Sequence, residues 1–475
     1  MSQKEKRSSS GAAGSRLAGL IVARLLSPLT SFVIAALVAR LWGTSQLGQL
    51  HTILSWFALF QFVCVFGIAE YISREIGKEP THAAKYFCHA LYCIVATSVL
   101  CVPFMVGARS LFDYDQGVRS GIAAISVALP FGAGAIVCHA VLTAFGRIQS
   151  IALISALESL VLLACAVFVI ANDLHLVLLI WGVTASRVIS AGASLWVVAR
   201  LTRPVEMSLD IGFLKIILPP ALVFGLTGVS FQVFMRAGAL MLSAMEDMES
   251  VGLFGSASKL AEMCLMLPIA FYVLNLPAAA YGYKTHPESM EGWMLARART
   301  LALPAFVVFV FGFTWAEQIL QTMYGQRFDQ AAWTLRILLI AFIVQCAEIV
   351  LGMCCQAAGY HRFTMYVSLL RALCVVVANA FLIPMFGVEG AAGATLAAIL
   401  ISFVVCARFA RRTLHRIDWR PLIVRPAVVS TVALALLYPC AAYINVVGHG
   451  ILYVLACALL FSAWQRARPM SIVGQ

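Results

Sequence analysis

The sequence predicts an all-α polytopic membrane protein with about 14 transmembrane helices. Three observations predict this fold class. Of the 475 residues, 62% are hydrophobic and only 11% are charged, and the mean hydropathy is +0.93, whereas soluble domains carry about 25% charged residues. Apolar runs long enough to cross a bilayer follow one another along the chain. The alternation of apolar and polar residues that is typical of an outer-membrane barrel is absent.

Each apolar run has about the 20 residues that a helix needs to cross the hydrocarbon of a bilayer. The runs lie at 17–41, 47–71, 86–108, 119–144, 150–171, 174–199, 214–243, 249–280, 296–320, 331–357, 363–385, 388–409, 422–444 and 447–465. Residues 1–15 are rich in Ser, Gly and Lys, and we expect a disordered cytoplasmic tail there. This composition excludes a soluble enzyme, a nucleic-acid-binding domain and a disulfide-stapled secreted module.

The net charge is +12. The basic residues lie between the apolar runs and form no stripe of the kind that binds nucleic acid. With the N-terminus inside, the inner segments carry most of the arginines and lysines, and the outer loops carry Arg109, Arg119 and Arg327. Positive loops stay on the cytoplasmic side, so we expect both termini in the cytoplasm and an even number of spans. No loop is long enough to hold a soluble domain.

The 14 cysteines lie within or against apolar runs, where cysteine behaves as a small apolar residue. Cys88, His89 and Cys93 come nearest to a ligand cluster, but their spacing does not match a zinc site. We therefore predict no metal and no cofactor, and assign the cysteines to packing.

Two pairs of fragments indicate an internal repeat. Phe145-Gly146-Arg147 and Ala358-Gly359-Tyr360 each open a span, and Leu47-Gly48-Gln49-Leu50 and Val251-Gly252-Leu253-Phe254 each lie near an outer turn. Parallel repeats of six helices place a substrate site near the midplane, between the lobes. We expect an N-lobe over 16–203, a C-lobe over 204–412, two further helices over 413–466 and a cytoplasmic tail over 467–475.

Ionisable side chains inside the spans are the candidate functional residues, because a charge in hydrocarbon is costly. They are Arg24, Glu158, Arg187, Arg236, Lys259, Glu262, Glu348 and Arg371. The alternative is that each pairs locally or reaches to an interface. For Lys259 and Glu262, which are three residues apart on one helix, local pairing is as plausible as a functional role.

Arg236 and Lys259 flank one outer turn, and each lies about 15 Å deep at 1.5 Å per residue. Two cations at one depth on adjoining helices repel each other, which favours a wet cavity that accepts an anion. Arg24 and Arg187 could add further cations to it. Glu158 and Arg371 occupy the same place in the proposed repeat, and we hypothesise that they face each other, or the cavity, as a gate or a fixed ion pair.

From Arg236 onward the chain resembles polysaccharide-repeat flippases, the Wzx-type transporters of the multidrug/oligosaccharidyl-lipid/polysaccharide (MOP) superfamily. The family pattern is roughly R-x-D-x-x-M-L, a short turn, then V-G-x-Y-x-x-A-x-x-L-x-E. The matching segments are Arg236-Ala-Gly-Ala-Leu-Met-Leu242, Val251-Gly-Leu-Phe254 with Ala257, Leu260 and Glu262, Tyr324-Gly325 with Phe328, Leu335-Arg336-Ile337, and Phe386-Gly387-Val388-Glu389-Gly390-Ala391-Ala392. The resemblance covers about residues 17 to 409.

Two positions depart from that pattern, since Gly238 replaces its aspartate and Phe254 its tyrosine. If the aspartate binds a coupling cation in relatives, this chain couples differently, or through Glu262 or Glu348. The resemblance implies two six-helix lobes plus two C-terminal helices in a bacterial inner membrane. It also implies alternating access, which would carry polyprenyl-diphosphate-linked oligosaccharide to the outer leaflet for lipopolysaccharide or exopolysaccharide synthesis. A polymerase or co-polymerase is an implied partner.

Two other functions stay open. A cation-coupled drug or metabolite antiporter of the same superfamily should carry carboxylates rather than arginines and lysines at its centre. A membrane polysaccharide polymerase or ligase should have a long, basic outer loop, and the outer loops here are short. No G-x-x-x-x-G-K-[ST] signature is present, so we expect an ion gradient, the membrane potential or downstream consumption to supply the energy.

Overall fold

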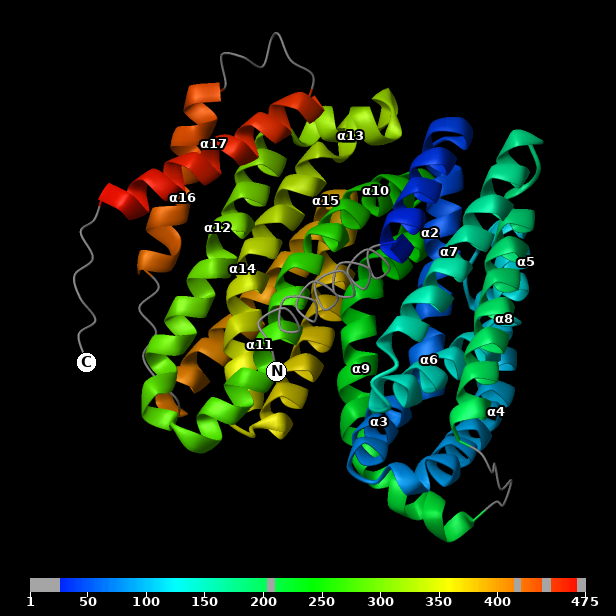
Figure 1. Ribbon diagram of the computed structural model, residues 1–475. Helices are drawn as coiled ribbons and strands as arrows, with labels where there is room; N and C mark the ends of the chain where they lie inside the picture. Colours follow the sequence, from blue (N-terminus) through cyan, green and yellow to red (C-terminus); the bar gives the residue numbers. More distant parts are fainter. Residues whose placement is uncertain (1–25, 203–209, 414–419, 438–445, 468–475) are drawn as a thin grey trace, which may run out of the picture. The chain divides into compact units, whose positions relative to one another are not determined.

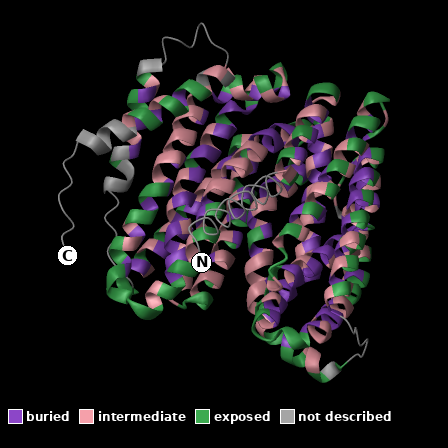
Figure 2. Cartoon of the chain, viewed as in Figure 1, coloured by how far each residue is buried: buried purple, intermediate pink, exposed green. Residues whose placement is uncertain are grey.

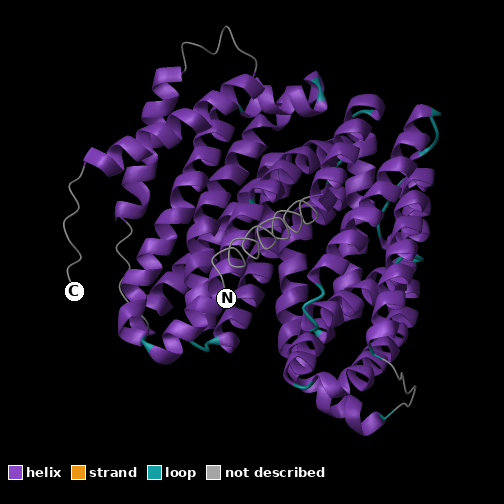
Figure 3. Cartoon of the chain, in the orientation of Figure 1, coloured by secondary structure: helices purple, strands orange, loops and turns teal. Residues whose placement is uncertain are grey.

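The computed structural model describes residues 26–202, 210–413, 420–437 and 446–467, and every regular element in these ranges is a helix (Figures 1 and 3). The first helix covers Leu26–Trp42. Those that follow are α2 (Thr44–Val65), α3 (Ile68–Lys78), α4 (Ala83–Ala108), α5 (Gln116–Ser126), α6 (Leu129–Ala144), α7 (Ile148–Ala171), α8 (Leu176–Leu201), α9 (Ile211–Met245), α10 (Met248–Cys264), α11 (Met266–Thr285), α12 (Met290–Thr314), α13 (Ala316–Tyr324), α14 (Ala332–Ala357), α15 (His361–Thr413), α16 (Arg420–Leu437) and α17 (Val446–Ala467).

The prediction of a polytopic helical membrane protein is confirmed. Nine helical segments within the described ranges are long and apolar enough to cross a membrane, and α5 with α6 passes the same test as a pair bent by 44°. The segment α15 joins two helices at Gly387, whose φ is 53°, so it supplies two spans. Leu26–Trp42, Pro426–Ala435 and Gly450–Leu460 are shorter apolar helices. The described residues thus hold nine segments that meet both criteria, or ten with the bent pair.

Large apolar side chains are exposed along the middle of the spans, and residues of all three burial classes alternate along the helices (Figure 2). On α4, Val99, Leu100 and Phe104 are each more than 60% exposed. A soluble protein would place such residues in its core, whereas a lipid-facing helix shows them to hydrocarbon. The exposed apolar faces are therefore the surfaces that meet lipid.

The described residues form two compact units, one up to Gly252 and one from Leu253 onward. In the first unit, a buried core joins α3, α4 and α6 through Ile72, Ile76, Phe87 and Val137. In the second unit, α14 packs against α11, α12 and α15, and Tyr453 of α17 packs against Phe311 of α12. The proposed lobes, divided at residue 203, stay a prediction.

The break between α2 and α3 is set by backbone geometry. Phe66 and Gly67 both have positive φ, 36° and 74°, and a Cβ at Gly67 would lie 2.2 Å from the nitrogen of Gly225 on α9. Only glycine lets the two backbones approach so closely. The 22 residues of α2 already span about 33 Å. The helix α3 follows the break and exposes Glu70 and Arg74 on its polar face.

The fragments Leu47–Leu50 and Val251–Phe254, which sequence analysis proposed as repeats, include the glycines of one helix crossing. A Cβ at Gly252 would lie 2.0 Å from the carbonyl oxygen of Thr44, and one at Gly48 would lie 1.9 Å from that of Met248. The Thr44 hydroxyl also donates a hydrogen bond of 3.2 Å to Oε1 of Glu249. The two glycines let α2 and α10 touch backbone to backbone.

The other two fragments, Phe145–Arg147 and Ala358–Tyr360, each form a turn, and the two turns have the same conformation. Gly146 and Gly359 both have positive φ, 66° and 91°. Arg147 N–H donates to Leu142 and Gly146 N–H to Thr143, while Tyr360 N–H donates to Cys355 and Gly359 N–H to Gln356. Both are Schellman helix ends with glycine in the left-handed position. The loose sequence similarity thus corresponds to the same backbone conformation in each unit.

We expect Gly252→Val to lower the melting temperature of the detergent-purified protein, because a branched side chain at this crossing collides with backbone that cannot move alone. Overpacking typically costs about 1–3 kcal/mol. Gly192→Ala on α8 is the control, since nothing lies within 4 Å of a Cβ there, and it should melt at or above the wild-type temperature. Equal melting of Gly252→Val and wild type would show that the crossing does not hold the unit together.

Candidate functional site

The intramembrane charges proposed from the sequence lie on six helices. Arg24 lies outside the described residues. The others are Glu158 on α7, Arg187 on α8, Arg236 on α9, Lys259 and Glu262 on α10, Glu348 on α14 and Arg371 on α15. Arg236 belongs to the first unit and Lys259 to the second, so the cavity proposed between them stays a prediction.

In the first unit, Glu158 and Arg187 form an ion pair between neighbouring helices. Nη1 of Arg187 lies 2.8 Å from Oε1 of Glu158, and the two side chains are 37% and 14% exposed. The guanidinium also lies 5.8 Å from the centre of the Phe57 ring on α2, within cation–π range. Arg187 is thus neutralised by a carboxylate and still keeps an accessible side.

Sequence analysis missed His139 on α6, which lies against α8. Its Nε2 lies 3.3 Å from the hydroxyl of Ser194 on α8, and it interacts electrostatically with both Glu158 and Arg187. The signal was present as a lone histidine in the run 119–144, but histidine carries no formal charge at pH 7 and so does not stand out among the ionisable side chains of the spans.

In the second unit, Glu348 and Arg371 form the corresponding pair between α14 and α15. Nη2 of Arg371 donates a hydrogen bond to Oε1 of Glu348. The side chain of Arg371 is 15% exposed and that of Glu348 is 3% exposed. Arg371 follows Gly359 by as many residues as Glu158 follows Gly146. Each therefore has a partner in its own unit, and the hypothesis that Glu158 and Arg371 face each other stays a prediction.

Lys259 and Glu262 form the local contact that sequence analysis left open. Nζ of Lys259 lies 3.8 Å from Oε2 of Glu262, one turn further along α10. Both side chains are about four-fifths buried. The contact reduces the cost of holding each charge in the span.

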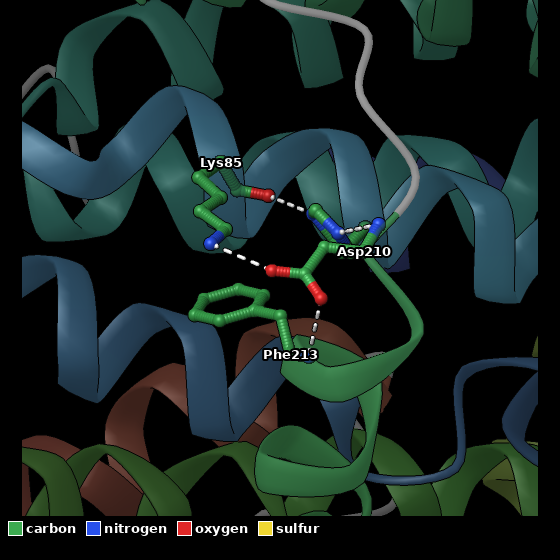
Figure 4. A network of polar contacts seen from close by, with 4 residues as sticks. Lys85, Asp210 and Phe213 are labelled. Atoms are coloured by element: carbon green, nitrogen blue, oxygen red, sulfur yellow. Dashed lines mark hydrogen bonds and ion pairs between the residues drawn. The ribbon is translucent and has the colours of Figure 1, made fainter.

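A polar network at the N-terminal ends of α4 and α9 fixes where α9 begins (Figure 4). Asp210 caps α9, since its Oδ1 accepts a hydrogen bond of 3.1 Å from Phe213 N–H, and its Oδ2 lies 3.1 Å from Nζ of Lys85. Lys85 also lies 4.4 Å from the centre of the Phe213 ring. The hydrogen bonds from Lys85 and from the Phe213 amide lower the pKa of the Asp210 carboxyl.

His89 completes this network and is fully buried. Its Nε2 accepts a hydrogen bond of 3.0 Å from Asp210 N–H, and its Nδ1 lies 2.7 Å from the Lys85 carbonyl. Because one nitrogen accepts, the other must donate, and the ring is therefore neutral. Both nitrogens are committed to the backbone, so His89 has no lone pair left for a metal.

Within the described ranges, no group of three or more His, Cys, Asp or Glu side chains could hold a metal ion, and every cysteine there carries a free thiol. Cys64, Cys138 and Cys406 are buried in helix contacts. These residues pack the core, as the apolar surroundings in the sequence indicate.

The family model described as polysaccharide biosynthesis protein matches residues 17–278. No curated protein matches the chain in sequence. Among solved structures, the lipid II flippase MurJ in an inward closed conformation superposes with a TM-score of 0.74, at 11% identity, over 94% of this chain and 99% of that one. An inward-facing multidrug resistance MATE family transporter of the MOP superfamily superposes with a TM-score of 0.69 at 16% sequence identity. That match covers 82% of this chain and 97% of that one. A MOP superfamily transporter from Pyrococcus furiosus superposes with a TM-score of 0.60 at 16% sequence identity, over 83% of this chain and 93% of that one.

We expect Glu348→Ala to destabilise the protein by about 3 kcal/mol, because it leaves the buried Arg371 guanidinium without its carboxylate. The double variant Glu348→Leu/Arg371→Met should be closer to wild type, since it removes both charges. Melting temperatures of the purified variants measure the two effects, with Arg371→Met alone as the matched control. A double variant as unstable as the sum of the two single variants would contradict a mutually neutralising pair.

The lowered pKa of Asp210 predicts a dependence on pH. The stabilisation is complete above the ordinary carboxyl pKa of about 3.9 and is lost as the pH falls through the lower folded-state value. The melting temperature of Asp210→Asn should therefore lie below that of wild type by a constant amount between about pH 7 and pH 5, and the gap should shrink below about pH 4. Asp113→Asn, at an exposed pair with Arg119, should change little at any pH. A gap that widened toward acid pH would show that the carboxylate is not the stabilising form.

Proposed function

The chain belongs to the polysaccharide biosynthesis protein family, and from this premise we propose that it flips polyprenyl-diphosphate-linked oligosaccharide repeat units from the cytoplasmic to the outer leaflet. The family match and the shared fold make it a multi-pass membrane transporter of the MOP superfamily type. The cargo, its direction and the inner-membrane location with both termini in the cytoplasm are part of the proposal.

The family match over residues 17–278 is the main support for the proposal. The intramembrane charges indicate how the cargo could be bound. A lipid-linked sugar has an anionic diphosphate and a polar glycan, neither of which crosses hydrocarbon unaided. Cations inside the spans can compensate the diphosphate charge. Arg187 suits this role because its side chain is 37% exposed, more than that of its partner Glu158.

We assign roles to the proposed site residues on the same grounds. Arg24, Arg187, Arg236 and Lys259 would bind the diphosphate. Glu262 and Glu348 are the carboxylates available for coupling to an ion, each next to a cation that it neutralises in the structure. Glu158 and Arg371, on equivalent spans, would break and remake their pairs as the two units move. A polysaccharide polymerase or co-polymerase would receive the cargo.

The second candidate is a cation-coupled drug or metabolite antiporter, favoured by the similarity of the fold to a MATE family transporter. An exporter of cationic substrates needs unpaired carboxylates at its centre, whereas here Glu158, Glu262 and Glu348 each lie against an arginine or a lysine. The pairing favours an anionic cargo. A membrane polymerase or ligase is disfavoured because the family and the matched folds are those of transporters.

Deletion of the gene tests the proposal. We expect lipid-linked repeat units to accumulate on the cytoplasmic leaflet and surface polysaccharide to be lost. Wild type should restore both, and Arg236→Gln should restore surface polysaccharide about tenfold less well, because a charge-assisted contact is worth about 1.5 kcal/mol or more. Arg362→Gln, at an exposed arginine at the start of α15, is the control and should complement fully.

Normal surface polysaccharide in the deletion strain, together with altered drug sensitivity, would reject the flippase and support the antiporter. Equal complementation by wild type and Arg236→Gln, at equal protein levels, would remove Arg236 from the proposed binding site.

A further inference from the structure

We propose that the C-terminal end of α15 binds the headgroup of an anionic phospholipid through Arg408, Arg411 and Arg412, which we call the α15 basic patch. All three side chains are exposed. None of them belongs to the diphosphate site proposed above, so the inference does not depend on the proposed function. The partner is identified by its charge and its place, as a phosphate in the leaflet that this end of α15 meets.

The patch shares one face of the helix with apolar side chains that are exposed to lipid. Leu400, Ile401 and Val404 are each about two-fifths exposed. Arg408 follows Val404 by four residues and Arg411 follows it by seven, so these side chains lie one above another on the same face. The exposed face of α15 thus changes from apolar to cationic within about 6 Å. A phospholipid presents the matching order, with acyl chains in the hydrocarbon core and a phosphate just outside it.

The opposite face of the helix is packed, and this packing fixes the direction of the patch. Cys406 and Ala410 are buried in one cluster with Leu351 of α14. The ring of Phe409 stacks on that of Phe363, with the ring centres 3.7 Å apart. The last turns of α15 therefore cannot rotate to bring the arginines into the core.

The charge of the patch has no carboxylate against it among the residues that the structure describes. Between residues 349 and 413 the one acidic residue is Glu389, which lies 19 residues before Arg408 and so about 28 Å away along the helix. Three arginines within five residues repel one another. A phosphate relieves this repulsion, because a guanidinium can bind it through two parallel hydrogen bonds.

The place of the patch favours a lipid over a soluble acidic partner. The arginines continue the lipid-facing apolar side chains on the same face, so bilayer phosphates are already within their reach. An acidic protein segment would have to displace those phosphates. Each basic residue near an anionic membrane surface tightens binding about fivefold, and salt weakens the attraction by screening.

Native mass spectrometry of the purified full-length protein in detergent tests the inference by counting retained lipids. The probes are dioleoylphosphatidylglycerol, which is anionic, and dioleoylphosphatidylcholine, which is zwitterionic. We expect wild type to retain more of the anionic lipid than of the zwitterionic one at equal concentration. Arg408→Gln/Arg411→Gln should retain one anionic lipid fewer than wild type, because the loss of two cations weakens the site about 25-fold. Arg408→Lys/Arg411→Lys, which keeps both charges, should retain as many as wild type.

The matched control is Arg74→Gln/Lys78→Gln. It also removes two exposed cations one turn apart, but these lie against Glu75 of the same helix. The control should retain as many anionic lipids as wild type. Raising the salt concentration about fivefold should release the additional lipid from wild type and change the α15 glutamine variant little.

Equal retention by the α15 glutamine variant and wild type, each eluting as a single species, would overturn the inference and favour a soluble acidic partner for the patch. Equal retention of the two lipids by wild type would overturn it as well, because the headgroup charge would then not be recognised. A loss in the α3 control as large as that in the α15 variant would show an effect of net charge rather than a site. None of these measurements involves the diphosphate cargo, so rejection of the flippase would leave the inference standing.

Discussion

Charge neutralisation inside the bilayer is the constraint on which the rest of this structure depends. A lone charge in hydrocarbon raises the free energy of the folded protein too far to persist. Three glutamates within the spans accordingly each lie against a basic side chain. Glu158 meets Arg187 and Glu348 meets Arg371, each across two neighbouring helices, while Glu262 meets Lys259 on one helix. These pairs fix which faces of α7 and α8, and of α14 and α15, turn toward each other.

Glycine supplies the second constraint, because it decides where backbones touch. Gly48 with Gly252, and Gly67 with Gly225, bring helices so close that no side chain fits between them. Membrane helices gain little from burying apolar surface against one another, since lipid is equally apolar, and close packing of small residues replaces that driving force. The broken span at Phe66 and Gly67 shows the same device at a bend.

The sequence was sufficient to predict the helical membrane class and the family. Hydrophobic length is a local property, so it can be read from the chain. The partners of the charges are not local. Sequence analysis proposed no contact between Glu158 and Arg187, because no sequence pattern links residues on two neighbouring helices, and the structure places Nη1 of Arg187 2.8 Å from Oε1 of Glu158. His139 was missed because a histidine carries no formal charge at pH 7, so it did not stand out among the apolar residues of its run. The lobe boundary at residue 203, drawn from the repeat, stays a prediction, and the described residues form compact units that divide after Gly252.

The anchoring of α9 has a consequence for how the chain can bend. Its first residue follows the Asp210 cap held by Lys85 and His89, its middle is pinned at Gly225, and Ser243 near its end contacts Tyr114. A rod fastened at three points along its length cannot itself act as a hinge.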